Sequence, residues 1–267
     1  MPIVEVAGGE LWYEEEGVGD PLLLIQGLGQ SSWVSRFHRA GLVERWRTIV
    51  FDNRGTGRSS KPPGPYSIEQ HADDAVAILD ALGMDQAHVL GHSMGGYIAQ
   101  ALALRHPERV RSLVLVGTSA GAPTHAPVPR ETLDAWLANA DRPPEAFARA
   151  TAFLSFAPGW TDEHPDEYEA FLTARLEHPT PPECFRAQLD ATTVWLEAGA
   201  PVEKIMAPTL VVHGDADRVV PIANGRGVAA RIPRARLAVV PGAGHYVMLE
   251  DPDGFNALVA RFLEDVA

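Results

Sequence analysis

The 267-residue sequence contains a single cysteine, Cys184, and this scarcity limits the chemistry that it can support. One cysteine cannot form a disulfide within the chain or build a cysteine-based metal site. No apolar run in the sequence approaches the roughly 18 residues that a membrane span requires. The first residues, MPIVEVAGG, also lack the basic start and apolar stretch of a signal peptide. We therefore expect a cytoplasmic protein without membrane association.

Positive charge is also scarce, because 35 Asp and Glu residues outnumber 22 Lys and Arg residues and give a formal net charge of -13. A surface of this sign repels phosphate backbones, so we expect no nucleic-acid partner. Hydrophobic residues make up 46% of the chain and charged residues 21%, a composition typical of a folded globular protein. The length suits one large α/β domain with an insertion.

Short apolar segments recur along the chain, with amphipathic helical segments between them. The expected strands are PLLLIQG (21–27), RTIVFDN (47–53), AHVLGHS (87–93), VRSLVLVGT (110–118), PTLVVHGD (208–215) and ARLAVVPG (235–242). Their continuous apolarity predicts strands that are buried on both faces, as in a parallel sheet covered by helices. Before them, IVEVAG and ELWYEEEG alternate apolar and polar residues and predict an antiparallel hairpin at the sheet edge. The pattern indicates the α/β class with a doubly wound, mostly parallel sheet.

Residues 121–204 interrupt this rhythm, because they contain no apolar β-like run. Four helices are expected there, near residues 130–140, 143–156, 162–178 and 182–198, with proline pairs at helix starts. We expect these residues to form a helical cap inserted into a core domain of residues 1–120 and 205–267. Most cap aromatics should pack onto the core, and a minority should line a substrate pocket. The pocket candidates are Trp136, Phe153 and Trp195 of the cap, with Gln26 and Tyr246 of the core.

Ser93 lies between two glycines in Gly91-His92-Ser93-Met94-Gly95, where an expected strand meets an expected helix. A serine hydroxyl is a poor nucleophile until a base removes its proton, and its attack creates an oxyanion that needs hydrogen-bond donors. A sharp strand-to-helix turn meets both needs, since it exposes the serine and aims the Met94 N–H at the oxyanion. The alternative is a glycine-flanked serine in an ordinary turn.

The partners of such a serine follow it in the order acid, then histidine. Of ten histidines, only His245 follows the last expected strand, in a glycine-rich loop that would open at the carboxyl edge of the sheet. Two aspartates of HGDADRVVP compete for the acid position, Asp215 and Asp217. An aspartate in such a loop also serves as a turn residue that bonds to nearby backbone.

These motifs resemble the α/β-hydrolase superfamily over nearly the whole chain. Gly214 to Pro221 is similar to the acid loop of that family, and the resemblance implies Asp217 as the acid and Asp215 as the turn residue. LLLIQGLGQSSW resembles the first loop of the family, with Gln26 in place of the usual histidine, and implies the Leu28 N–H as a second oxyanion donor.

FDNRGTGRSSKP is similar to the Asp-x-Arg-Gly-x-Gly-x-Ser turn of the same family. We expect its Asp52 and Arg54 to have a structural role in tying loops together. The chain from Asp52 to Gly83 and from Gly91 to Gly121 also looks similar to 3-oxoadipate enol-lactonases and small carboxylesterases.

The resemblance implies a serine hydrolase of a small-molecule carboxylic ester or lactone, with Ser93, His245 and Asp217 as a catalytic triad and without a cofactor or metal. A serine at this strand-to-helix turn disfavours dehalogenases and epoxide hydrolases, which place an aspartate there.

Two alternatives remain open. One is a carbon–carbon bond hydrolase of ring-opened dienone acids. Such an enzyme needs an arginine near the start of the helix that follows Ser93, whereas Arg105 lies about three turns along that helix. The other is a non-catalytic protein that binds a small ligand on the same fold. The sequence leaves the oligomeric state open.

Overall fold

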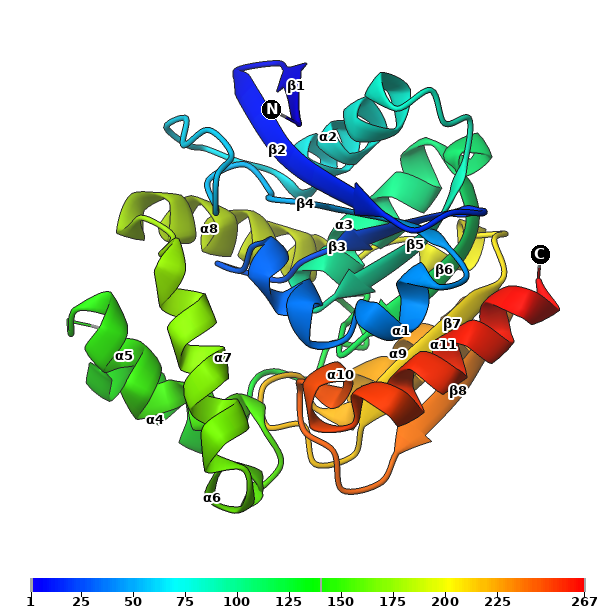
Figure 1. Cartoon of the computed structure of the whole chain (residues 1–267). Coiled ribbons are helices and arrows are strands. Elements are labelled where there is room, and N and C mark those ends of the chain that lie inside the picture. The colour runs from blue at the N-terminus through cyan, green and yellow to red at the C-terminus, as the bar shows by residue number, and fades with distance from the viewer. Residues whose placement is uncertain (1, 140, 267) are drawn as a thin grey trace.

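The structure is a computed structural model that describes residues 2–139 and 141–266. Within these residues a single eight-stranded sheet has the order β1-β2-β4-β3-β5-β6-β7-β8 (Figure 1). Its strands are β1 (Ile3–Val6), β2 (Gly9–Glu16), β3 (Pro21–Ile25), β4 (Arg47–Phe51), β5 (Ala87–His92), β6 (Val110–Val116), β7 (Thr209–Gly214) and β8 (Ala235–Val240). β2 is antiparallel to β1 and β4, and the strands from β4 to β8 in that order run parallel. The fold class and the edge hairpin are confirmed.

Helices cover both faces of the sheet. One face carries α2 (Ile68–Ala81), α3 (Met94–Arg105) and α9 (Ile222–Arg231), and the other carries α1 (Ala40–Val43), α10 (Val247–Glu250) and α11 (Pro252–Asp265). Leu23 and Ile25 of β3 pack into the hydrophobic core on the α2, α3 and α9 face. Leu22 and Leu24 pack into the core on the opposite face. Successive side chains of a strand point to opposite faces, so a wholly apolar strand supplies both layers of the core.

Ser67 and Asp251 cap the starts of α2 and α11. The Ser67 hydroxyl accepts a hydrogen bond from the Gln70 N–H at 3.0 Å, and the Asp251 carboxylate accepts one from the Gly254 N–H at 2.9 Å. Each side chain satisfies a backbone donor that the first turn of a helix leaves free.

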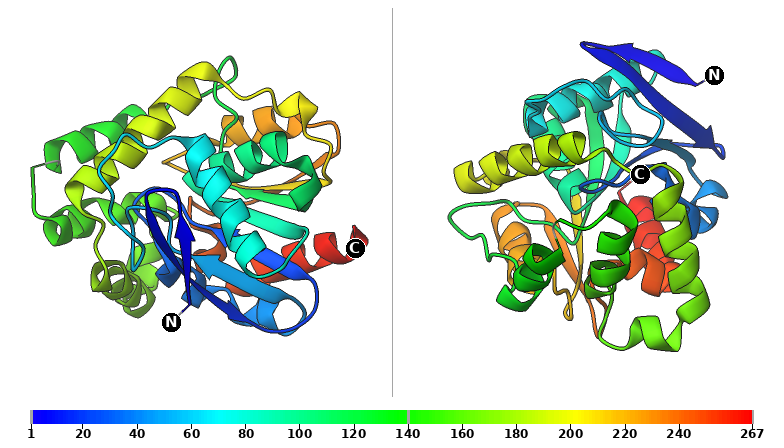
Figure 2. Two further views of the ribbon diagram at one scale, coloured as in Figure 1. Left: turned by 90° about the horizontal axis from the view of Figure 1, so that it is seen from above. Right: turned by 90° about the vertical axis from the view of Figure 1, so that its left-hand side faces the viewer.

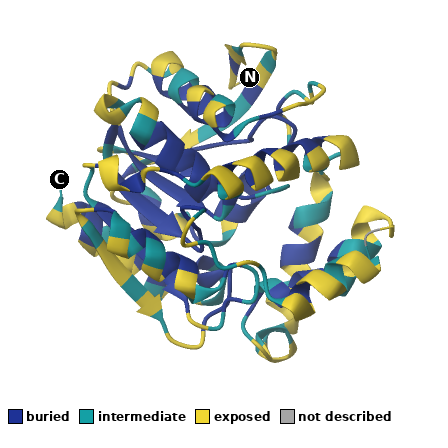
Figure 3. Ribbon diagram, turned by 180° about the vertical axis from the view of Figure 1, so that it is seen from behind, coloured by how far each residue is buried: buried dark blue, intermediate teal, exposed yellow. Residues whose placement is uncertain are grey.

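β8 contradicts the expectation that every apolar strand is buried on both faces. Leu237 and Val239 are each 37% exposed, whereas every residue of the neighbouring β7 is buried (Figure 3). β8 is the edge strand of the sheet and pairs on one side alone. Its apolar sequence therefore does not distinguish an edge position from a central one.

The inserted segment, residues 121–204, lies between β6 and β7 and is largely helical. Its helices are α4 (Arg130–Asn139), α5 (Pro144–Thr151), α6 (Trp160–Glu163), α7 (Pro165–Glu177) and α8 (Pro182–Ala198). The helix expected over 143–156 ends in a 3₁₀ turn, and the one expected over 162–178 is divided before Pro165. Residue 140, the expected end of the first helix, lies outside the described residues. The division into cap and core domains stays a prediction.

The inserted segment gathers at one end of the sheet, beside the loops that follow the parallel strands (Figure 2). The loop after β8 bonds to it, since the His245 N–H donates to the Ser155 carbonyl at 2.9 Å. The loop after β3 bonds to it as well, since the Gly29 N–H donates to the Gln188 side chain at 2.9 Å. No helix among the described residues combines the length and apolarity that crossing a membrane demands.

Candidate active site

Ser93 occupies a strained turn between β5 and α3. Its φ of 56° makes it the one non-glycine residue with a positive φ among the described residues. The turn is held at the sheet, because the Ser93 N–H donates to the Val116 carbonyl at 2.9 Å. A Cβ atom at Gly91 would collide with the Gly95 carbonyl, so this tight turn requires glycine there. An observed strain of this kind is typical of functional sites, where the surrounding structure maintains it.

His245 and Asp217 form a buried pair beyond the ends of β8 and β7. The His245 Nδ1 lies 2.8 Å from Asp217 Oδ2, and both side chains are buried. Asp217 Oδ1 accepts hydrogen bonds from the Val219 and Val220 N–H groups at 2.8 Å each. The carboxylate is therefore fixed by backbone donors on one oxygen and faces the imidazole with the other.

The electrostatics of Asp217 favour its charged form. Burial by itself would raise its pKa, but the charge of His245 and hydrogen bonds from His213 and His245 hold the pKa below its ordinary value. His213 Nε2 donates to the Val220 carbonyl at 2.7 Å and lies 3.4 Å from Asp217 Oδ2. Asp217 thus remains a carboxylate that can orient His245.

Asp215 lies apart from this pair. It is exposed, and its Oδ1 accepts a hydrogen bond from the Gly242 N–H at 2.7 Å. The expected bond to the backbone of its own turn is not observed, because Gly242 lies 27 residues further on, in the loop after β8. Of the two aspartates it is Asp217 that contacts His245.

His92 connects the serine turn to the histidine loop. Its Nε2 donates to the His245 carbonyl at 3.0 Å, and the two imidazole rings lie 4.6 Å apart. Burial, with the nearby His245, holds the pKa of His92 well below its usual value, so the ring is neutral. Among the described residues, no group of three or more His, Cys, Asp or Glu side chains gathers in a way that could hold a metal ion.

Two backbone amides are the expected oxyanion donors. Met94 is the first residue of α3, so its N–H has no intrahelical partner. Leu28 lies in the β3–η1 loop, residues 26–31, which precedes the 3₁₀ helix η1 (Ser32–Phe37). Gly27 and Gly29 on either side donate to side chains, whereas the Leu28 N–H donates to no group within the described chain.

Of the pocket candidates, the structure brings Tyr246 and Gln26 close to these residues. Tyr246 is buried, its ring lies 5.8 Å from that of His245, and its hydroxyl accepts a hydrogen bond from Gln30 Nε2 at 2.7 Å. Gln26 is buried in the β3–η1 loop, where its carbonyl accepts a hydrogen bond from Asn53 Nδ2 at 3.1 Å. Gln30 was not expected from the sequence, because a polar residue in a glycine-rich loop carries no distinguishing pattern.

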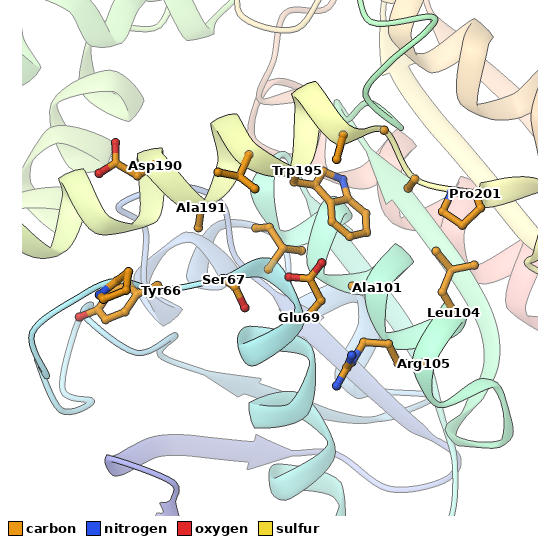
Figure 4. Close-up of a pocket in the computed structure, with 16 residues that line it drawn as sticks. Tyr66, Ser67, Glu69, Ala101, Leu104, Arg105, Asp190, Ala191, Trp195 and Pro201 are labelled. Atoms are coloured by element: carbon orange, nitrogen blue, oxygen red, sulfur yellow. The ribbon is translucent and has the colours of Figure 1, made fainter.

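The three cap candidates are dispersed. Trp195 lines a cavity of about 390 Å³ between α2, α3 and α8 whose lining includes none of Ser93, Asp217 and His245 (Figure 4). Phe153 is 39% exposed, with the Arg218 guanidinium 5.8 Å from its ring centre. Trp136 is half-buried on α4. Contact of these side chains with a substrate stays a prediction.

The Asp52–Arg54 turn ties loops together as expected. Arg54 forms a two-pronged ion pair with Asp74 of α2, at 2.6 and 2.5 Å, and both side chains are buried. Asp52 accepts hydrogen bonds from the Ser32 and Arg58 N–H groups at 2.7 Å each. The turn therefore joins the loop after β4 to α2 and to the start of η1.

Known proteins resemble the chain over nearly its full length. It is 32% identical to a putative carbamate hydrolase RutD of Azorhizobium caulinodans, over 100% of this chain and 99% of that protein. It is 35% identical to a 2-hydroxymuconate semialdehyde hydrolase of Pseudomonas sp. (strain CF600), over 94% of this chain and 89% of that protein. Among solved structures, Est816, described as an N-acyl homoserine lactone degrading enzyme, has a TM-score of 0.81 and 32% identity, covering 98% of this chain and 100% of that one.

A profile of the alpha/beta hydrolase fold family matches residues 20–252. That range includes the Ser93 turn, Asp217 and His245, and the observed sheet order has the mostly parallel arrangement expected from the sequence. The chain therefore belongs to the alpha/beta hydrolase fold family and is a hydrolase.

Proposed function

We propose that this protein is a serine hydrolase that cleaves a small-molecule carboxylic ester or lactone through an acyl-enzyme. The observation that carries the proposal is the strained Ser93 turn, with a φ of 56° in a residue that has a Cβ atom. Such strain costs on the order of 1–3 kcal/mol, and a merely connecting turn would avoid it with glycine. We further propose that the protein acts in the cytoplasm and needs no cofactor.

The proposed reaction begins when the Ser93 Oγ attacks the carbonyl carbon and His245 Nε2 accepts its proton. The hydrogen bond between His245 Nδ1 and Asp217, at 2.8 Å, leaves Nε2 as the free basic nitrogen. The tetrahedral intermediate then collapses as His245 protonates the leaving oxygen. Water, activated by His245, attacks the acyl-enzyme and releases the acid and Ser93.

The oxyanion of each tetrahedral intermediate would bind to the Leu28 and Met94 N–H groups. Both amides are available, since one begins α3 and the other donates to no group within the described chain. Donors that are oriented before the reaction stabilise the developing charge without reorganisation.

The names of the relatives support hydrolysis at a carbonyl that carries a heteroatom leaving group. A lactone-degrading enzyme and a putative carbamate hydrolase each match the chain at 32% identity. Esters, lactones and carbamates share an acyl carbon that a serine can attack, so one triad serves all three groups.

Carbon–carbon bond hydrolysis of a ring-opened dienone acid is the second candidate. A 2-hydroxymuconate semialdehyde hydrolase matches the chain at 35% identity.

The test is a substrate panel of p-nitrophenyl acetate and butyrate, an acyl homoserine lactone, a carbamate and a dienone acid, assayed with wild type and Ser93→Ala. We expect Ser93-dependent turnover of an ester or lactone, with kcat reduced about 10⁴-fold or more in the variant. Turnover of the dienone acid alone would establish the second candidate. Wild-type activity that survives in Ser93→Ala would refute the mechanism, and binding without any turnover would indicate a ligand-binding protein.

A further inference from the structure

Gly29 of the β3–η1 loop is held by the inserted segment through both of its backbone polar groups. Its N–H donates to Gln188 Oε1 at 2.9 Å, and its carbonyl accepts a hydrogen bond from the Thr180 hydroxyl at 3.0 Å. Gln188 lies on α8 and Thr180 lies just before that helix. A Cβ atom at Gly29 would lie 2.7 Å from a ring carbon of Phe185, also on α8, so the helix packs directly against this glycine.

Gln188 is a buried side chain whose amide oxygen and amide nitrogen are both hydrogen-bonded, so it crosslinks two segments of the chain. Its side chain has no solvent exposure, and while Oε1 accepts from Gly29, Nε2 donates to the Arg54 carbonyl at 3.0 Å. One partner is a donor and the other an acceptor, so a single orientation of the amide satisfies both. Arg54 is itself fixed by its buried ion pair with Asp74. Gln188 therefore ties the loop to a rigid part of the core.

The peptide on the other side of Leu28 is also held. The Gly27 N–H donates to Gln30 Oε1 at 3.3 Å, and the Gly27 carbonyl accepts a hydrogen bond from the Gln30 N–H at 3.2 Å. The direction of the Leu28 N–H is thus set by contacts at Gly27 and Gly29. The contacts at Gly29 come from the inserted segment.

We infer that Gln188, assisted by Thr180, is a positioning residue that aims the Leu28 N–H at the oxyanion. The inference rests on the proposed function, since it assigns a role in the stabilisation of the same tetrahedral intermediate. It makes α8 part of the catalytic framework rather than only a cover for substrate. Loss of the crosslink weakens binding of the transition state more than binding of the substrate.

The primary test is Gln188→Met, which keeps the side-chain length and removes both hydrogen bonds. We expect kcat for an ester substrate to fall about 10- to 100-fold while KM changes less than about twofold, because an oxyanion donor acts mainly in the transition state. A trifluoromethyl ketone, which forms a tetrahedral adduct with serine, should bind more weakly by a similar factor. Thr193→Val is the matched control, since Thr193 is exposed on the same helix and bonds to the Leu189 carbonyl; its kinetics should not change.

Unchanged kcat in a folded Gln188→Met, or a rise in KM alone, would overturn the inference. If that variant does not fold, Thr180→Val decides. A threefold or larger fall in kcat at constant KM supports the positioning role of the Gln188 and Thr180 contacts, and unchanged kcat refutes it. Ser93→Ala in the same assays separates the two proposals. Activity independent of Ser93 defeats the proposed function, whereas Ser93-dependent activity that is insensitive to Gln188 and Thr180 defeats only the inference.

Discussion

On the sheet side of the candidate site, Ser93, Asp217 and His245 each follow a strand, whereas α8 contacts the β3–η1 loop through side chains on and just before that helix. The sheet side fixes geometry through the backbone, as in the bond from the Ser93 N–H to the Val116 carbonyl. The α8 side fixes geometry through one buried amide and one hydroxyl. A backbone contact survives most substitutions, but a side-chain crosslink depends on a single residue. The difference locates the part of the site that mutations are most able to adjust.

Asp217, the acid on the sheet side, should show the largest effect on kcat. Asp217→Asn should lower kcat about 10⁴-fold, because an amide cannot hold the His245 tautomer that leaves Nε2 basic. Asp215→Asn is the matched control, since Asp215 is exposed and accepts a hydrogen bond from the Gly242 N–H rather than contacting His245; it should retain most activity. Steady-state kinetics on a p-nitrophenyl ester measures both. A severe loss in Asp215→Asn with activity retained in Asp217→Asn would move the acid assignment.

The second test concerns the Asp52–Arg54 turn. Its Arg54 carbonyl accepts a hydrogen bond from Gln188 of α8, and its Arg54 guanidinium pairs with Asp74 of the core. Arg54→Leu leaves the Asp74 carboxylate buried without its ion-pair partner, and we expect the free energy of unfolding to fall by about 3–5 kcal/mol. Arg105→Leu removes an exposed pair with Asp73 and should cost less than about 1 kcal/mol. Urea unfolding measures both variants. Equal losses would show that burial of the Arg54 pair has no structural weight.

The smallest expected effect concerns a buried imidazole in the core. Burial, with the nearby charge of Arg39, lowers the pKa of His38 from 6.5 to about 4 in the folded protein. Below pH 6.5 the unfolded chain therefore binds a proton that the folded chain does not, so stability is full above that pH and falls between pH 6.5 and 4. We expect His38→Leu to reduce this slope by roughly 1 kcal/mol per pH unit, measured by urea unfolding across that range. An unaltered slope in the variant would contradict this account.

Most of the fold was predictable, because the signals were local. Ser67 and Asp251 cap helices through atoms three residues away, and each expected strand is present within about two residues of its expected bounds. The burial of β8 was not predictable, since edge and central strands have similar apolar sequences. The pocket was the least predictable part, because the facing of Trp195 depends on how α8 packs against α2 and α3.

Gln188 carried a signal in the sequence that periodicity alone could not interpret. It lies in the apolar stripe of α8 with Cys184, Ala191 and Trp195, where a polar side chain must find a buried partner. The two partners, Gly29 and Arg54, are more than a hundred residues away in the chain. No local pattern identifies a contact at that separation.

The sequence by itself determined the order of strands and helices and the glycine-flanked turn at Ser93, because these depend on side-chain period and on backbone sterics within a few residues. Only the tertiary structure decided that Asp217 rather than Asp215 contacts His245, and that α8 holds Gly29 beside Leu28. Those contacts join segments that are distant in the chain, so their geometry exists only once the sheet and the inserted segment have packed together.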